Sequence, residues 1–330
     1  MDNLVLVARQ VAALFVLMGF GAAMRRTKLI GDVAIDGFVN VLILVVTPCV
    51  IVDVFQRPFD PSSLSSLGLA FAIAVLGHLV VIPLAMLLVR HRDENVRKPL
   101  MLAAVFSNAG FMGIPLEQAI LGDRGVFFGA SYIVVFNLFI WSWGLKVMKG
   151  NGERLARRLV RQSLRGGGSL GEGGGTEVVK MVLNPGTIGI ALGLPLFLFS
   201  ARLPSFLAVP VHHLANLNTP LAMIVIGYGL AGAKLGQVAR NPSVYVASLI
   251  RLVGYPLLFV AAMYPFRAHL DRDMMLAMCI AASAPVAAMV SMFATKFRRD
   301  IDTGVAVVSG TTLLSIITMP AVIALAMSLL

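Results

Sequence analysis

The residues best able to hold a ligand lie where an apolar helix is interrupted. The segment 107–115 (SNAGFMGIP) sets Asn108 beside Gly110 and Gly113, with Pro115 two residues further on. Glycine and proline both weaken a helix, so we expect the backbone to break here. The ends of two half-helices would offer free amides and partial charges to an anion, and the Asn108 side chain could donate as well. The alternative is a simple proline kink, as in many membrane helices.

A second interruption stands in the other half of the chain. The segment 281–285 (AASAP) contains Ser283 and ends in Pro285, 170 residues after Pro115. Two broken helices at equivalent positions can cross within a membrane, where protein covers the unpaired backbone. We therefore predict one substrate-binding site that draws on both interruptions: Asn108, Gly110, Gly113, Pro115, Ser283 and Pro285.

Three ionisable residues inside apolar segments are further candidates, because a charge within the bilayer is costly. Arg251 could hold the carboxylate of a substrate bidentately, or it could be a fixed partner for a helix end or a buried acid. His78 titrates near neutrality, so it could carry a coupling proton or be a hydrogen-bonded packing residue. Glu117 could bind a proton or a cation, although it stands toward the outer end of its segment.

The segments that must position these residues are long and apolar. The 330-residue chain is 58% hydrophobic and 13% charged, with a mean hydropathy of +0.88. An ordinary soluble domain is about 25% charged. A membrane helix needs about 20 apolar residues. Ten spans are therefore predicted, at residues 4–24, 33–55, 62–89, 99–120, 125–148, 181–200, 205–231, 243–266, 274–295 and 302–329.

The second half of the chain repeats the first. Arg251 follows His78 by 173 residues, and Thr219 with its proline follows Thr47 and Pro48 by 172. A repeat of five spans is odd, so its two copies have opposite orientations, as in secondary transporters. The predicted fold is an all-α membrane protein with ten helices in two inverted five-helix repeats, in which broken helices 4 and 9 cross. The repeats are residues 1–150 and 181–330, joined by a linker at 151–180.

The net charge of +11 does not indicate a nucleic-acid partner, because of where the charges lie. Alternate connections between the predicted spans hold 20 of the 27 Lys and Arg residues. By the positive-inside rule this side is cytoplasmic, which places both termini outside. The linker contains a basic amphipathic stretch at 153–165, suited to anionic lipid headgroups, and a glycine-rich stretch at 166–175. It is either a tether or a docking segment for a regulatory partner.

Several enzymatic signatures are missing from the sequence. There is no Walker A motif and no His-Glu-x-x-His motif, so neither ATP-driven transport nor metal-dependent hydrolysis is indicated. Cys49 and Cys279 both fall inside spans and indicate neither a disulfide nor a metal site. We predict a protein that is not an enzyme and that carries no cofactor.

The segment NAGFMGIPL at 108–116 resembles the fourth-helix motif of the auxin efflux carrier family, in which an asparagine precedes Met-Gly-Ile-Pro-Leu. The end of the chain is similar to that family as well. It has Ala284-Pro285, a basic stretch at 296–299, the sequence SGTT at 309–312 and then Pro320. The short central connection resembles the bacterial branch, which includes malate and malonate permeases.

The resemblance implies a fold similar to sodium/proton antiporters and bile-acid symporters. Helices 1, 2, 6 and 7 would form a scaffold, and helices 3–5 and 8–10 a mobile transport domain that moves like an elevator. It further implies a small carboxylate substrate, coupling to a proton or sodium, a homodimer, and location in the bacterial inner membrane. Two alternatives stay open: a sodium-coupled organic anion symporter of this fold, and an anion channel or sensory membrane module.

The charge asymmetry leads to a test of topology. If the basic connections are cytoplasmic, a cysteine introduced by Ser169→Cys should resist impermeant thiol reagents in intact cells and react after permeabilisation. Labelling is read by a gel shift of the full-length protein. Reaction of Ser169→Cys in intact cells would show that the orientation is opposite.

Overall fold

The computed structural model describes residues 2–149, 185–232 and 242–330. Within these ranges the chain is helical and forms no strand, which confirms the predicted all-α class. Seven of the described helical stretches are long and apolar enough to cross a membrane. They are Val7–Arg26, Asp32–Phe55, Pro61–Leu88, Asp123–Lys149, Ser205–Ala231, Pro242–Phe266 and Ile301–Leu329.

The first half of the chain folds into helices with three π-helical turns, labelled η1 to η3, inserted among them. Their bounds are α1 (Asp2–Arg26), α2 (Asp32–Val41), η1 (Leu42–Val46), α3 (Thr47–Phe55), α4 (Pro61–Leu88), α5 (Glu94–Val105), η2 (Ala109–Gly113), α6 (Ile114–Leu121), α7 (Asp123–Phe139), η3 (Ile140–Gly144) and α8 (Leu145–Lys149). The linker predicted at 151–180 lies outside the described residues.

The described residues of the second half include one further π-helical turn, η6, and a short 3-10 turn, η7. Its elements are α11 (Pro185–Leu198), α12 (Ser205–Asn216), α13 (Asn218–Ala231), α14 (Pro242–Leu249), η6 (Ile250–Gly254), α15 (Tyr255–Met263), η7 (Tyr264–Phe266), α16 (Arg272–Ser283), α17 (Met289–Lys296) and α18 (Ile301–Leu329).

Three of the ten predicted spans are not single long helices. The segments at 99–120 and 274–295 are each broken, into α5 with η2 and α6, and into α16 with α17. The segment at 181–200 corresponds to α11, of 14 residues, and its first four residues lie outside the described ranges. The breaks have the predicted cause, since they fall at Phe106 to Asn108 and at Ala284 to Ala288, beside the glycines and prolines. The ten-helix count and the inverted repeat stay predictions.

Prolines also account for three of the π-helical turns. The turns η1, η2 and η6 each end two residues before a proline, at Pro48, Pro115 and Pro256. A proline lacks the backbone donor and its ring displaces the carbonyl of the preceding turn, so the helix widens locally. At η1 the hydroxyl of Thr47 donates to the Leu42 carbonyl at 2.9 Å and occupies one acceptor of the widened turn.

Aspartates begin four of the helices. Asp60, Asp93, Asp271 and Asp300 each accept a hydrogen bond from a backbone N–H in the first turn of α4, α5, α16 and α18. Such caps satisfy amides that have no partner within the helix. At Asp60, hydrogen bonds from the Ser62 and Ser63 hydroxyls lower the pKa of the carboxyl below its usual value.

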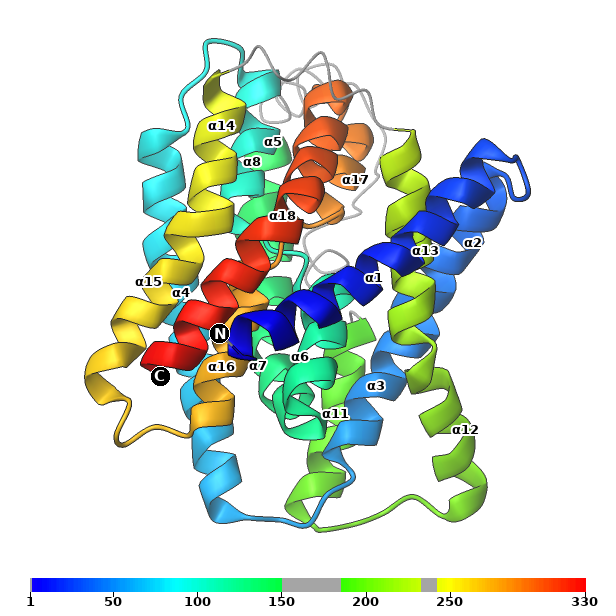
Figure 1. Cartoon of the computed structure of the whole chain (residues 1–330), viewed down its shortest axis with the longest axis vertical. Helices are drawn as coiled ribbons and strands as arrows, with labels where there is room; N and C mark the ends of the chain where they lie inside the picture. The colour runs from blue at the N-terminus through cyan, green and yellow to red at the C-terminus, as the bar shows by residue number, and fades with distance from the viewer. Residues whose placement is uncertain (1, 150–184, 233–241) are drawn as a thin grey trace, which may run out of the picture.

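Figure 1 shows α2, α3, α12 and α13 on one side of the molecule and α4, α14 and α15 on the other. The broken helices and α7 lie between these two groups. The long helix α1 runs obliquely beside α13, and the two are in extensive contact. The helix α11 packs along α3, while α7 packs against α4 and α16.

The two broken helices meet through their unwound backbones. Ser107 and Val286 form an isolated antiparallel bridge. The Asn108 N–H donates to the Pro285 carbonyl at 2.7 Å, and the Ala287 N–H donates to the Phe106 carbonyl at 2.9 Å. Backbone groups that have left a helix need partners inside a membrane, and here each unwound segment supplies the partners of the other.

Arg251 holds the two half-helices that end at this crossing. Its guanidinium donates to the Val105 carbonyl at 2.8 Å, at the end of α5, and to the Ala282 carbonyl, near the end of α16. The side chain is fully buried, and its guanidinium carbon lies 4.4 Å from the Tyr255 ring centre. The carboxyl end of a helix carries partial negative charge, so one cation here stabilises both half-helices.

Glycines allow α1 and α13 to pack backbone to backbone. A Cβ atom added at Gly21 would collide with the Ile224 backbone, and one added at Gly227 would collide with the Met18 carbonyl. Small residues in membrane helices permit such close approach and let van der Waals contact drive their association. The separation of α1 and α13 is therefore set by these two positions.

The position of Arg251 leads to a stability prediction. Arg251→Gln should lower the free energy of unfolding by about 2 kcal/mol or more, because two buried carbonyls lose charged donors. Arg251→Lys should be intermediate, since one ammonium cannot reproduce the planar fork. The unfolding temperature of the purified protein measures both. Arg272→Gln is the matched control, because Arg272 also donates to a carbonyl, that of Met327 at 3.1 Å, but is exposed. Equal stability of Arg251→Gln and the control would contradict this role.

The contact of α1 with α13 gives a second prediction. Gly227→Ala should destabilise the protein by about 1–3 kcal/mol, because the new methyl group must push the two backbones apart. Gly229→Ala, two residues further along α13, is the control, since a Cβ there meets nothing within 4 Å. Thermal unfolding in detergent should separate the two variants, and identical unfolding temperatures would contradict the close packing.

Candidate functional site

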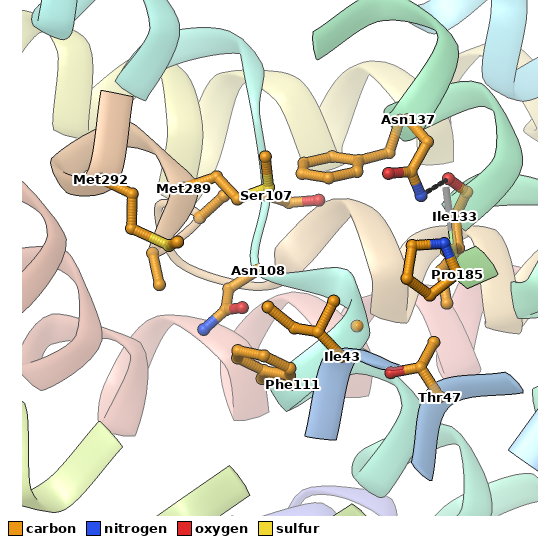
Figure 2. A pocket seen from close by; sticks show the side chains of 14 residues that line it. Ile43, Thr47, Ser107, Asn108, Phe111, Ile133, Asn137, Pro185, Met289 and Met292 are labelled. Carbon is orange, nitrogen blue, oxygen red and sulfur yellow. Dashed lines mark hydrogen bonds between the residues drawn. The ribbon is translucent and has the colours of Figure 1, made fainter. Parts of the chain in front are cut away.

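A cavity opens directly beside the crossing of the broken helices. This crossing cavity and its open mouth together hold about 690 Å³ of empty space. It is lined from the first broken helix by Ser107, Asn108 and Gly110, and from the second by Ala287, Ala288 and Met289. Ile43 and Thr47 on η1 and α3, Ile133 and Asn137 on α7, and Pro185 on α11 contribute from other elements (Figure 2).

Asn108 is the polar side chain at the point where the unwound backbone becomes helical again (Figure 2). The residue is 6% exposed, and its side-chain amide makes no hydrogen bond within the described ranges. The backbone on both sides is fixed, because the Asn108 N–H bonds to Pro285 and the Asn108 carbonyl accepts from Met112 at 2.9 Å. The amide is thus a positioned donor and acceptor with free capacity.

The start of a half-helix borders the crossing cavity on each side. The helical stretch formed by η2 and α6 begins at Ala109, and α17 begins at Met289. The first N–H groups of a helix have no partner within it, and its amino end carries partial positive charge. Arg251, in contrast, sits at the carboxyl ends of α5 and α16. The crossing therefore presents its two positive ends to the cavity and covers its two negative ends with a guanidinium.

The other polar residues of the crossing cavity are already hydrogen-bonded. The Asn137 amide donates to the Ile133 carbonyl at 2.8 Å, and the Ser107 hydroxyl donates to the Tyr132 hydroxyl at 3.0 Å. Asn137 could not be predicted from the sequence, because it has no glycine or proline beside it to mark a break. Thr47 stands out in the sequence only as a mark of the repeat, although a polar residue before a proline is a usable signal.

The remaining predicted substrate-binding residues lie around the crossing without lining its cavity. Pro285 joins the site through its carbonyl, which accepts from Asn108. Ser283 is fully buried and donates to the Ile280 carbonyl at 2.8 Å. Gly113 permits close packing, since a Cβ added there would lie 3.5 Å from the Ala281 Cα atom, and Pro115 is buried one turn behind. Arg251 lies behind the crossing, where its guanidinium bonds to the ends of two helices. This is the alternative that the sequence left open beside a role as carboxylate ligand.

His78 lies in an aromatic environment on α4. Its Nδ1 atom is 2.8 Å from the Ala74 carbonyl oxygen and 3.2 Å from the Tyr255 hydroxyl. The imidazole stacks on Phe139, with ring centres 5.1 Å apart and planes inclined by 8°. Its Nε2 atom is buried and has no hydrogen-bond partner in the described part of the chain. The residue does not line the crossing cavity.

Glu117 is buried in the same half-helix that begins beside Asn108. It is 1% exposed, and its Oε2 atom has no hydrogen-bond partner among the described residues. Two glycines make room for the carboxyl group. A Cβ added at Gly129 on α7 would collide with it, and one added at Gly113 would lie 3.8 Å from Oε1. A buried carboxyl group without a partner can relieve the cost of its charge by binding a proton or a cation.

Comparison with known proteins adds to this geometry. A family model described as a membrane transport protein matches residues 6–163 and 174–323, nearly the whole chain. No curated protein gives a significant match. The family match, the Asn-to-Pro segment beside the crossing and the seven apolar helices agree with one another. The chain is an integral membrane protein, and it belongs to the auxin efflux carrier family of membrane transport proteins.

Proposed function

We propose that the protein carries small organic acid anions across the bacterial inner membrane by alternating access, with the substrate bound in the crossing cavity. The observation that supports this most directly is the convergence of the unbonded Asn108 amide and two helix amino ends on one cavity. Helix amino ends favour anions, and a side-chain amide can donate to a carboxylate. The apolar part of the lining, including Ile43 and Met289, would accommodate the carbon chain of the acid.

The proposed motion is of the elevator type between two parts of the molecule. The scaffold would comprise helices 1, 2, 6 and 7, that is α1, α2 with α3, α11, and α12 with α13. The transport domain would comprise helices 3–5 and 8–10, that is α4 to α8 and α14 to α18. The crossing cavity lies between these two groups, because η1, α3 and α11 line one wall and the broken helices line another. In this proposal each group combines helices from both of the inverted five-helix repeats, and a homodimer would form through the scaffold.

A coupling ion completes the proposal. Glu117 is attached to the half-helix that carries Asn108, so proton binding at its carboxyl could act on the substrate site through one rigid element. His78 is the second candidate for the proton, through its unpartnered Nε2 atom. Sodium-coupled symport on the same fold is the alternative, with Glu117 as the group that would contact the cation.

The substrate proposal is tested at Asn108. Thermal-shift measurements against small mono- and dicarboxylates should identify a ligand, since a ligand that binds the folded state raises its unfolding temperature. Asn108→Ala should then weaken binding by about 1–3 kcal/mol, or about 5- to 150-fold in Kd, because a ligand carboxylate loses its donor. The unliganded variant should unfold near the wild-type temperature.

Asn137→Ala is the matched control for this experiment. It removes an asparagine from the same cavity, but one whose amide is already bonded to Ile133. The control should therefore weaken binding less than Asn108→Ala. Full carboxylate affinity in Asn108→Ala would refute the proposed site.

A further inference from the structure

A second cavity reaches Asn108 from the other side. With its open mouth it holds about 1160 Å³ of empty space, and it lies between α1, α2 and α13 on one side and η2, α17 and α18 on the other. Asn108 and Phe111 line both this cavity and the crossing cavity, so the two meet at the proposed substrate site. Besides Asn108, the polar residues of its wall are Arg25, Ser291, Ser309 and Thr312. We refer to it as the Arg25 cavity.

Arg25 is the one charged residue among the described residues that line this cavity. Within the described ranges no carboxylate lies at ion-pair distance from its guanidinium. Asp32 is the acidic residue connected to it, through Tyr228, whose hydroxyl lies 3.0 Å from the Asp32 carboxylate, and Asp32 is not part of the lining. An uncompensated cation at the wall of a cleft concentrates anions and repels cations.

The guanidinium of Arg25 is held in place by α13. It donates to the Tyr228 carbonyl at 3.2 Å, and its central carbon lies 4.8 Å from the Tyr228 ring centre. It also rests on Gly232, where an added Cβ would collide with it. These contacts use one N–H and one face of the guanidinium, and an arginine has five N–H donors. A positioned arginine with unused donors suits a carboxylate, which it can bind bidentately.

We propose that Arg25 selects anions for the transport site: a carboxylate moving between the basic side of the molecule and Asn108 passes this guanidinium. The inference rests on the proposed function and names the residue that gives the site its charge preference. It also separates two roles, carboxylate binding and bonding to helix ends, for which Arg251 was the candidate in the sequence. Arg251 positions the crossing, and the half-buried Arg25 at the end of α1 supplies the positive charge of the cavity wall.

Because the substrate is not identified, the charge preference is measured with thiol reagents of opposite charge. Ser291→Cys places a thiol in the wall of the Arg25 cavity. The purified full-length protein is treated with the anionic sulfonatoethyl and the cationic trimethylammonium-ethyl methanethiosulfonates. Tandem mass spectrometry, which assigns the modified residue within a peptide, gives both rates at position 291 and separates them from any reaction at Cys49 or at Cys279, which shares its tryptic peptide. With Arg25 present, the ratio of anionic to cationic rate should exceed that of a free thiol in solution.

Adding Arg25→Gln should lower this ratio by about fivefold or more, because a unit charge on the wall of the same cavity acts on the two reagents in opposite directions. Arg25→Lys should retain most of it. Arg26→Gln is the matched control, since it removes the same charge from the next residue, which is exposed and outside the lining. It should leave the ratio nearly unchanged.

Three results would overturn the proposal: a thiol at position 291 that reacts with neither reagent, an unaltered ratio in Arg25→Gln, or an equal fall in Arg26→Gln. If Arg25→Gln does not fold, the ratio measured with Arg25 present still decides, because a value no higher than that of a free thiol excludes a positive cavity. The outcome is independent of the carboxylate screen. If position 291 prefers the anionic reagent but no carboxylate binds in the thermal-shift screen, the substrate proposal is refuted. Arg25 would then still be the charged residue of the cavity wall.

Discussion

The fold depends on pairing two stretches of backbone that have left their helices inside an apolar medium. Each such group would be very costly if it faced lipid, and the crossing removes the cost by bonding one stretch to the other. Asn108 and Ala287 donate across it, and Arg251 covers the carbonyls of Val105 and Ala282. The consequence is a rigid centre in which both negative helix ends are neutralised and both positive ends remain available.

The positions of the breaks could be predicted from the sequence, because their causes are local. Glycines 110 and 113 with Pro115, and Pro285 in the other half, weaken helices wherever they occur, and both breaks are found at or directly before these residues. Asn108 could be predicted for the same reason, since it is the last residue of the first unwound stretch. The all-α membrane class followed from apolar length alone.

The roles of the arginines could not be predicted in the same way. The partners of Arg251 are backbone carbonyls at the ends of α5 and α16, and a carbonyl leaves no mark in the sequence. Arg25 stands in a basic connection, where a positive charge is sufficiently explained by topology, and only the fold shows that α13 turns it toward a cavity. Ser283 and Gly113 do not line the cavity, because the rotation of a half-helix beside a break is set by tertiary packing.

The bridge between Ser107 and Val286 has a consequence for how the protein is made. When the first half of the chain has entered the membrane, the Asn108 amide and the Phe106 carbonyl still lack the partners that the second half supplies. Until Pro285 and Ala287 arrive, this part of the first half must be shielded by the insertion machinery or by water rather than lipid. Integration of the two halves is therefore coupled: the centre of the molecule becomes stable in a bilayer only after nearly the whole chain has been synthesised.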